Sequence, residues 1–280
     1  QVGNSLENRE IYNKSVYGIE KKALPHMLCV TNMLIHDIDD PNILHGNALE
    51  TDYKELRKME PFDVILMNPP YGGSEKESVK VNFPMELRSS ETADLFMNVI
   101  MYRLKKNGRA AVIIPDGFLF GTDNAKFNIK KKLFSEFNVH TVIRMPHSVF
   151  APYTSIRTNI LFFDNTKSTE GTWFYRVDMP EGYKNFSKTR PMKLEHFNDA
   201  MAWWENREDI EVEGYPKAKK YTINEIVNRS YNIDLCGFPH EEEVILEPMD
   251  LIQEYQEKRA SLNAEIDHVL DQITSMLGGN

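Results

Sequence analysis

The sequence has no long hydrophobic run. Across its 280 residues no apolar stretch approaches the roughly 18 residues of a membrane-spanning helix. Its polar start, QVGNSLENRE, holds no apolar segment of the kind a secretory signal needs. We therefore expect no membrane association and no export. A hydrophobic content of 41% still suffices for one or two globular domains with a sizeable core.

Cysteine is equally scarce. Cys29 and Cys236 stand far apart, without the spacing of a metal site or of a disulfide framework. The eight histidines are scattered, and neither HxxxH nor CxxC occurs. These absences predict a metal-free protein of the reducing cytoplasm.

An excess of basic residues is also absent. The net charge is −9, but ten acidic and two basic residues in 241–280 give that segment −8, which leaves −1 for residues 1–240. A nearly neutral body supplies little of the attraction that drives non-specific DNA binding. If DNA is the substrate, we expect another subunit to hold most of it.

Short apolar runs alternate with longer amphipathic stretches, which is typical of a parallel sheet with helical crossovers. The runs that we interpret as strands lie at 16–20, 42–48, 63–68, 109–115, 139–146 and 158–165, with an edge strand at 172–180. The stretches with helical periodicity lie at 22–37, 93–108 and 123–137. Residues 72–92 are polar and long enough for a lid or binding loop.

The carboxyl terminus carries a different pattern. From Ile252 to Met276, large or apolar residues recur at alternating spacings of three and four, with Arg259 the one charged member. This heptad seam predicts a helix that packs against a partner helix or back on its own body. We favour a partner subunit, through a coiled-coil-like contact over residues 252–276.

The stretch FDVILMNPPYGG (62–73) carries the clearest chemical signal. Asn68 ends an apolar strand, and such strand ends face the crevice where open α/β sheets bind ligands. Pro69 and Pro70 remove two backbone donors, which leaves the Asn68 amide oxygen and the Pro69 carbonyl as neighbouring acceptors. Tyr71 adds a flat ring beside them. A plain turn after a strand is the alternative interpretation.

Two such acceptors can hold both hydrogens of an exocyclic amino group. Held in this way, the nitrogen moves toward tetrahedral geometry and its lone pair is freed from the ring. An aromatic side chain such as Tyr71 can stack on the base, which must first leave the duplex. Asn68, Pro69, Pro70 and Tyr71 are therefore our candidate catalytic residues for alkylation of adenine.

The sequence resembles the amino-group DNA methyltransferases that use S-adenosylmethionine, and it is more specifically similar to the modification subunit of type I restriction–modification systems. Blocks in the family's order run through nearly the whole chain, including VYGIEKKALPHMLCVTNMLIHDI, ILHGNAL, FDVILMNPPYGG, NGRAAVIIPDGFLFG and VIRMPHSVFAPYTSIRTNILFF. The resemblance implies a Rossmann-like α/β methyltransferase fold with a helical extension at the carboxyl terminus. It also implies adenine-N6 methylation, S-adenosylmethionine as cofactor, and double-stranded DNA, a specificity subunit and a restriction subunit as partners.

The resemblance also suggests a cofactor site. Glu20 matches the acid that accepts hydrogen bonds from the cofactor ribose, as a carboxylate after a strand does in nucleotide-binding folds. Asn47 stands where the family most often has an aspartate that contacts the adenine amino group, and its amide oxygen is an alternative acceptor. Asp94 and Phe96 match the helix start that lines the methionine end.

One family feature has no counterpart. The glycine-rich loop that cradles the cofactor is absent, and the only glycine pairs are Gly72-Gly73 and Gly278-Gly279. We therefore expect a carboxyl-terminal fragment that lacks the first strand and is inactive alone. The expected domains are a catalytic domain at 1–165, an extension at 166–240, and an acidic helix for subunit contact at 241–280.

Two other functions remain open. The Asn-Pro-Pro-Tyr tetrapeptide also occurs in protein-glutamine and rRNA methyltransferases, which would act without an acidic coiled-coil tail. The chain could also be a non-catalytic assembly module that binds a specificity subunit through its terminal helix.

Overall fold

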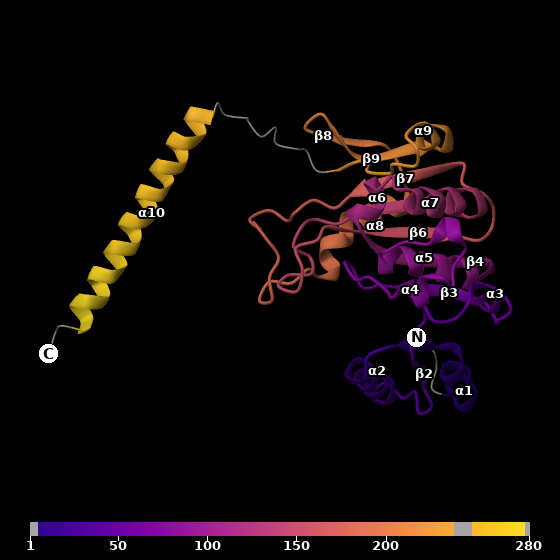
Figure 1. Ribbon diagram of the computed structural model, residues 1–280. Coiled ribbons are helices and arrows are strands. Elements are labelled where there is room, and N and C mark those ends of the chain that lie inside the picture. The colour runs from indigo at the N-terminus through magenta and orange to yellow at the C-terminus, as the bar shows by residue number, and fades with distance from the viewer. Residues whose placement is uncertain (1–4, 238–247, 278–280) are drawn as a thin grey trace. The chain divides into compact units, whose positions relative to one another are not determined.

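The structure, a computed structural model, describes residues 5–237 and 248–277. The chain divides into two compact units, Gln1–Gly237 and Phe238–Asn280, and each is described by itself. The first unit holds all of the described strands (Figure 1). The described part of the second unit is one helix, α10 (Pro248–Leu277).

The main sheet of the first unit has seven strands in the order β3-β4-β6-β5-β7-β9-β8. Its strands are β3 (Phe62–Met67), β4 (Leu104–Pro115), β5 (Asn138–Arg144), β6 (Thr158–Asp164), β7 (Gly171–Arg176), β8 (Ile210–Val212) and β9 (Tyr215–Thr222). The pairings make β6 and β9 antiparallel to the other five strands. The expected Rossmann-like α/β fold is confirmed, with a mixed sheet: the pairs β3–β4 and β5–β7 are parallel, and the other neighbouring pairs of the main sheet are antiparallel. The 172–180 run is not an edge strand, because β7 lies between β5 and β9.

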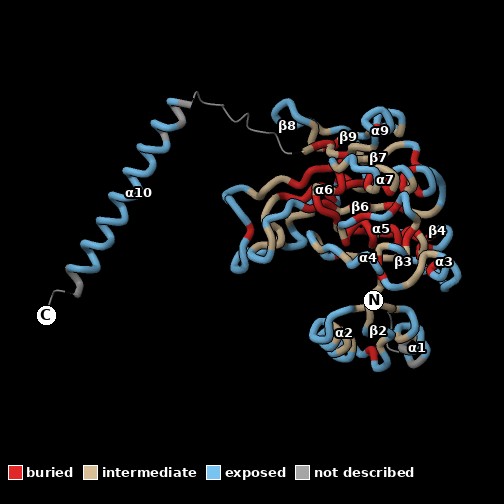
Figure 2. Tube along the Cα trace, viewed as in Figure 1, coloured by how far each residue is buried: buried red, intermediate tan, exposed pale blue. Residues whose placement is uncertain are grey.

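Helices cover both faces of this sheet. The helices of this part of the chain are α3 (Tyr53–Leu56), α4 (Glu77–Lys80), η1 (Met85–Leu87), α5 (Thr92–Arg103), α6 (Asp116–Phe120), α7 (Asn124–Glu136), η2 (Leu194–Phe197), α8 (Asn198–Glu205) and α9 (Ile223–Asn228). Side chains of a strand alternate between faces, so Val142 joins the core beneath α5 and α7 while Ile143 packs on the α8 side. Buried residues concentrate in this layered part of the chain (Figure 2).

A second, two-stranded sheet is built by β1 (Tyr17–Glu20) and β2 (Asn42–His45), which pair in parallel. Helices α1 (Leu6–Ser15) and α2 (Ala23–Ile35) flank these strands. The rings of Tyr17 and Phe62 lie 5.1 Å apart and connect this sheet to the start of β3. In the main sheet β3 pairs with β4 alone, so its other edge is not paired by any strand of the described chain.

That free edge changes one expectation. A continuous apolar run such as VILM (64–67) predicts a strand buried on both faces, as in parallel sheets, yet Leu66 is 77% exposed and Val64 is 48% exposed. Burial on both faces requires strands and helices on all sides, and in the described residues β3 has a strand on one side only.

Two other boundaries differ from the sequence prediction. The expected helix 93–108 ends at Arg103, and Leu104 already pairs with Phe62 as part of β4. The polar segment 72–92 is not a plain loop. It contains α4 and η1, and it buries Val79, Phe83 and Leu87.

Helix α10 confirms the helix predicted for the carboxyl terminus. Its side chains are described at most positions, and those of the apolar seam are about half exposed, including Leu262, Ile266, Val269 and Ile273. No helix among the described residues is long and apolar enough to cross a membrane.

Candidate functional site

The Asn-Pro-Pro-Tyr stretch lies where strand β3 ends. The register pairs Met67, the last residue of β3, with Val112 of β4. Strands β3, β4, β5 and β7 run in one direction, so their carboxyl ends meet at one edge of the sheet. Asn68 therefore occupies the edge where open α/β sheets bind ligands. Pro69 is buried beneath it, whereas Asn68 and Pro70 are exposed.

Asn68 and Tyr71 form a direct contact. The Tyr71 hydroxyl donates a short hydrogen bond to the Asn68 amide oxygen. The Tyr71 ring is half-buried, and burial raises the pKa of its hydroxyl to about 12. The hydroxyl thus remains a proton donor at neutral pH and satisfies the same oxygen that a substrate amine would use.

Two glycines shape the chain that follows. Gly72 has a φ of +69°, in the region that side chains disfavour. A Cβ on Gly73 would lie 2.9 Å from the Thr92 hydroxyl, and the Thr92 backbone amide donates to the Gly73 carbonyl at 3.0 Å. The start of α5 therefore packs directly against the residues after Tyr71. This packing brings the Asp94 region close in the chain's fold to the Asn-Pro-Pro-Tyr stretch.

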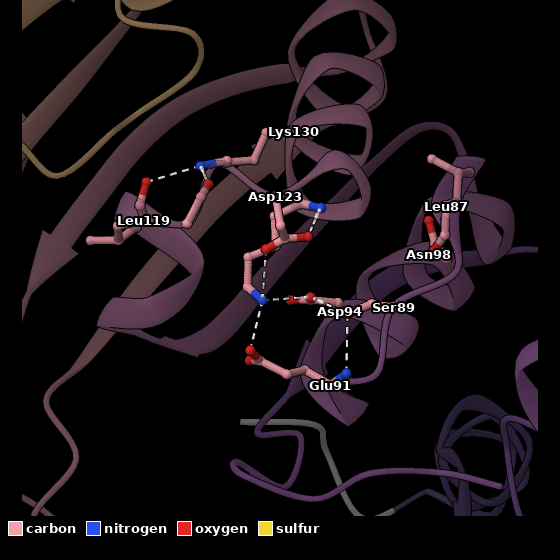
Figure 3. A network of polar contacts seen from close by, with 10 residues as sticks. Leu87, Ser89, Glu91, Asp94, Asn98, Leu119, Asp123 and Lys130 are labelled. Atoms are coloured by element: carbon pink, nitrogen blue, oxygen red, sulfur yellow. Dashed lines mark hydrogen bonds and ion pairs between the residues drawn. The ribbon is translucent and has the colours of Figure 1, made fainter. Parts of the chain in front are cut away.

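Asp94 belongs to a buried polar network at that helix start (Figure 3). Its carboxylate is fully buried, accepts a hydrogen bond from the Ser89 hydroxyl at 2.6 Å, and lies 3.2 Å from the Lys126 ammonium. Lys126 also pairs with Glu91 at 2.7 Å and with Asp123 at 3.3 Å. Burial raises the pKa of Asp94, while the Ser89 hydrogen bond and the Lys126 charge oppose that rise.

The network holds together the segment before α5, α5 itself and α7. One carboxylate oxygen of Asp94 has no partner among the described residues. Asp94 therefore retains one acceptor, although its main contacts are structural. Phe96, the next predicted cofactor residue, is half-buried and packs against a cluster that includes Leu95 and Phe83. Both residues thus make mainly structural contacts, and only Asp94 retains an unpartnered polar atom among the described residues.

Glu20 and Asn47 come together at the carboxyl end of the parallel β1–β2 pair. The Gly46 amide donates to the Glu20 carbonyl at 3.0 Å, which sets Asn47 next to the end of β1. One Glu20 carboxylate oxygen accepts from the Lys22 amide at 2.7 Å. A carboxylate has two oxygens, so the second is suited to a ribose diol.

Asn47 is oriented differently from our expectation. Its amide oxygen accepts from the Leu49 backbone amide at 3.1 Å, while its buried Nδ2 has no partner among the described residues. The group left over is thus a donor, which suits a ring nitrogen of a base rather than an amino group. An unpartnered buried donor at the strand end that also carries the Glu20 carboxylate fits a polar ligand, such as the nucleoside end of S-adenosylmethionine.

One residue that we did not predict lies at the site. The rings of Tyr71 and Phe150 are 6.2 Å apart between centroids and tilted by 54°. Phe150 belongs to residues 145–157, which connect β5 to β6. The stretch PHSVFAPY supported the family resemblance, but nothing in it singles out the phenylalanine, because the contact spans about eighty residues of sequence.

The model of the family described as N-6 DNA methylase matches residues 2–244. The chain is 42% identical over 279 residues to the methylase subunit of the type I restriction enzyme EcoEI from Escherichia coli, and the match covers 99% of this chain and 56% of that protein. The EcoKI methylase subunit from Escherichia coli strain K12 is 29% identical over 205 residues, which cover 66% of this chain and 36% of the relative. The chain thus spans about half the length of the EcoEI subunit and about a third of the EcoKI subunit.

Solved structures give the same picture. A modification subunit of a putative type I restriction enzyme from Vibrio vulnificus YJ016 superposes with a TM-score of 0.72 at 40% identity, covering 80% of this chain and 47% of that one. A chain from a type I restriction–modification system, solved to explain complex assembly and conformational transition, superposes with a TM-score of 0.76 at 29% identity, covering 98% and 57%.

Proposed function

Because the chain belongs to the N-6 DNA methylase family, we propose that it forms the catalytic part of the modification subunit of a type I restriction–modification system, an S-adenosylmethionine-dependent methyltransferase acting on N6 of adenine in double-stranded DNA. The observation that carries this proposal is the cluster of Asn68, Tyr71 and Phe150 at the carboxyl edge of the sheet. The cluster combines an acceptor for an amine with two aromatic rings for a base.

In this mechanism the chain holds the target adenine at its amino group and on both faces of its ring. The Asn68 amide oxygen and the Pro69 carbonyl accept the two hydrogens of the adenine amino group, and the Tyr71 hydroxyl gives up its bond to Asn68. Tyr71 stacks on the base, and Phe150 closes the other side of the pocket. The amine is its own nucleophile, so no covalent enzyme intermediate forms, and positioning with electrostatics supplies the rate.

Bound S-adenosylmethionine would supply the electrophilic methyl group on its sulfonium sulfur. For its nucleoside end we propose the Glu20 carboxylate as acceptor for the ribose hydroxyls and the Asn47 Nδ2 as donor to the base. For its methionine end we propose the start of α5 with Asp94 and Phe96, where one Asp94 oxygen is without a partner among the described residues.

Asn68→Ala tests the catalytic part of the proposal in the protein expressed from its complete reading frame, with the subunits encoded beside it. Losing a preorganised polar group costs catalysis about 100-fold or more in kcat. Tyr71→Ala and Phe150→Ala remove stacking and should each cost roughly 5- to 150-fold. Methyl incorporation into genomic DNA that lacks the modification is the measurement.

Asn128→Ala is the matched control, since this asparagine of α7 donates to the Glu86 carbonyl on the outer surface. It should methylate at the rate of the unaltered protein. Undiminished methylation by Asn68→Ala would overturn the assignment. Label found in release factors or ribosomal RNA, with none in DNA, would favour the protein-glutamine or rRNA class instead.

For the partners, we propose that α10 contacts a specificity subunit through its apolar seam, and that this subunit and a restriction subunit complete the assembly. The seam is exposed along α10, and Arg259 is its one charged member. Ile266→Glu should abolish co-purification with the specificity subunit. Ala264→Glu, which adds the same charge outside the seam, should leave co-purification unchanged. We also propose that the protein works in the cytoplasm, where the DNA of a cell without a nucleus lies.

A further inference from the structure

Arg144 is a buried charge at the carboxyl edge of the main sheet. It is the last residue of β5, and its side chain is 5% exposed. Its guanidinium donates to the Asp234 carboxylate at 2.5 Å and lies 3.5 Å from the Asp116 carboxylate. A buried guanidinium with two carboxylate partners is held in one position, because leaving its charge unpaired in the interior is costly. The two carboxylates are less buried, with Asp116 23% exposed and Asp234 36% exposed.

These contacts enclose both ends of the connection 145–157. Arg144 immediately precedes this connection, and its register partner across the sheet is Asn159, just beyond the other end. The Asn159 amide donates to the Asp116 carboxylate at 2.7 Å, and the Asp116 backbone amide donates to the Arg157 carbonyl at 3.0 Å. Asp116 thus links the residue before the connection to residues at its far end.

The connection carries Phe150, the ring that faces Tyr71. It is also tied along its length, since the Ser148 hydroxyl accepts from the Phe186 amide at 2.8 Å. Its two ends have little freedom as long as Arg144 and Asp116 remain paired. The ion pair of Arg144 and Asp116 thus lies at the ends of the segment that carries Phe150.

We propose that Arg144, acting through Asp116, is a positioning residue for methyl transfer: it fixes the 145–157 connection so that Phe150 and Tyr71 form the two walls of the base pocket. This role rests on the proposed function. Several polar atoms of the cluster, namely the Arg144 Nε, the Asn159 Oδ1 and the Thr158 hydroxyl, are buried without a hydrogen-bond partner among the described residues. The cluster therefore holds buried polar atoms that lack hydrogen bonds, which costs stability. We expect such a cost in a cluster whose role is to position the 145–157 connection.

Arg176 provides a matched control. It is the last residue of β7, which runs parallel to β5, and its side chain is 3% exposed. Its guanidinium also binds a carboxylate, that of Asp178 at 2.6 Å, together with the Gly237 carbonyl at 2.9 Å. Its carboxylate partner lies two residues along the same segment, whereas Asp116 links Arg144 to the far end of the 145–157 connection. The two arginines thus match in burial and in place on the strand, and each pairs with at least one carboxylate.

The test compares Arg144→Gln, Asp116→Asn and Arg176→Gln in the protein from its complete reading frame with its co-encoded subunits. The target sequence is first mapped in methylated DNA, and a duplex with 2-aminopurine at the target base then reports base flipping. Thermal unfolding, kcat and the KM values for DNA and for S-adenosylmethionine are measured for each variant. A misplacement of about 1 Å costs on the order of 100-fold in rate.

We expect Arg144→Gln and Asp116→Asn to lower kcat about 100-fold and to change the 2-aminopurine signal, with KM for S-adenosylmethionine within about threefold of the unaltered protein. Arg176→Gln should lower the Tm as much as Arg144→Gln does, but it should keep kcat within about threefold of the unaltered protein. Arg144→Lys, which restores the positive charge, should recover part of the rate that Arg144→Gln loses. Parallel losses of kcat and Tm in Arg144→Gln and Arg176→Gln would overturn the positioning role, as would an unchanged kcat in the isosteric Asp116→Asn.

Failure of the proposed function gives a different result. If the unaltered protein transfers no methyl group to DNA, the proposed function falls and the positioning role falls with it. If the unaltered protein methylates DNA and the two Arg144-cluster variants do so equally well, only the positioning role falls.

Discussion

Helices α2 and α5 have nearly the same length and a similar share of apolar residues, yet they lie in opposite environments. Ten of the 12 residues of α5 are buried, whereas none of the 13 residues of α2 is. Leu28 of α2 is 58% exposed and Ile35 is 73% exposed, while Leu95 and Ile100 of α5 are fully buried. The difference lies in what surrounds each helix in the described chain, because α5 packs on the seven-stranded sheet and α2 flanks a sheet of two strands.

This comparison separates the two halves of the proposed site. Asn68 and Tyr71 stand at the edge of the well-packed sheet, held by the start of α5. Glu20 and Asn47 stand at the end of the sparsely packed β1–β2 pair. An exposed apolar helix beside a binding edge is typical of a surface that contacts something else. Substitutions in the two regions should therefore differ sharply in their effect on stability.

The largest effect should follow from breaking the buried charge network of α5. Lys126→Met leaves the Asp94 carboxylate buried without its counter-charge, which should lower the free energy of unfolding by about 4 kcal/mol. Urea denaturation measures this change. Lys131→Met, at an exposed neighbouring position, should stay within about 0.5 kcal/mol, and equal effects in both variants would refute the buried-network account.

A pair of leucines tests the comparison between the helices directly. Leu95→Ala should cost about 3 kcal/mol, because the residue is fully buried and leaves a cavity. Leu28→Ala should cost less than about 0.5 kcal/mol, since its side chain is already exposed. Similar losses of unfolding free energy for the two variants would mean that α2 is packed in solution.

A pH dependence distinguishes buried from exposed lysines. Lys130 is fully buried, and desolvation lowers its pKa to about 8 even though its ammonium donates to the Leu119 and Gly121 carbonyls. Because the folded pKa lies below the unfolded value of 10.5, the unfolded chain binds more protons between these values. Stability from this group is therefore present at high pH and is lost as the pH falls through about 8.

The unfolding free energy should rise by about 2 kcal/mol between pH 7.5 and 9.5, relative to Lys130→Met at each pH. Lys131→Met should reproduce the pH profile of the unaltered protein. Subtracting the variant removes the contributions of other groups, such as Cys236, whose pKa burial raises to about 11. A flat difference between the unaltered protein and Lys130→Met would contradict the burial of this ammonium.

The smallest effect concerns helix caps. Thr222 caps α9 in a capping box with Glu225, and Thr222→Ala should cost about 1 kcal/mol of global stability. Ser5 caps α1 through the Asn8 amide, and Ser5→Ala should fray α1 while leaving the global midpoint in place. Hydrogen exchange measures the opening of each helix, and urea denaturation measures the global midpoint. A shifted global midpoint in Ser5→Ala would contradict the contrast between the well-packed main sheet and the sparsely packed β1–β2 region.

The sequence predicted the strands better than it predicted their surroundings. Alternation and apolar runs located β1 to β7, and β3 ends at Met67, one residue before the predicted end at Asn68. The exposure of β3 could not be predicted, since the same apolar run describes a strand with one neighbour or two. Likewise, three buried anchors, Val79, Phe83 and Leu87, order a segment whose composition indicates a loop.

Site residues that act through distant contacts were also out of reach. The pairing of Phe150 with Tyr71 and of Arg144 with Asp116 follows from the strand order β3-β4-β6-β5, which a single sequence does not specify. The orientation of Asn47 depends on its hydrogen bond to Leu49, a local turn that the pattern ILHGNAL does not reveal. The catalytic and cofactor roles of these residues stay predictions.

The most direct test of the account identifies the product. The protein from its complete reading frame, with its co-encoded subunits, is incubated with unmethylated DNA and S-adenosylmethionine carrying a labelled methyl group, and the digested nucleosides are analysed by mass spectrometry. We predict label in N6-methyldeoxyadenosine, lost with Asn68→Ala. Label in N4-methyldeoxycytidine alone, or in no deoxynucleoside, would contradict an adenine clamp built on Asn68 and Tyr71.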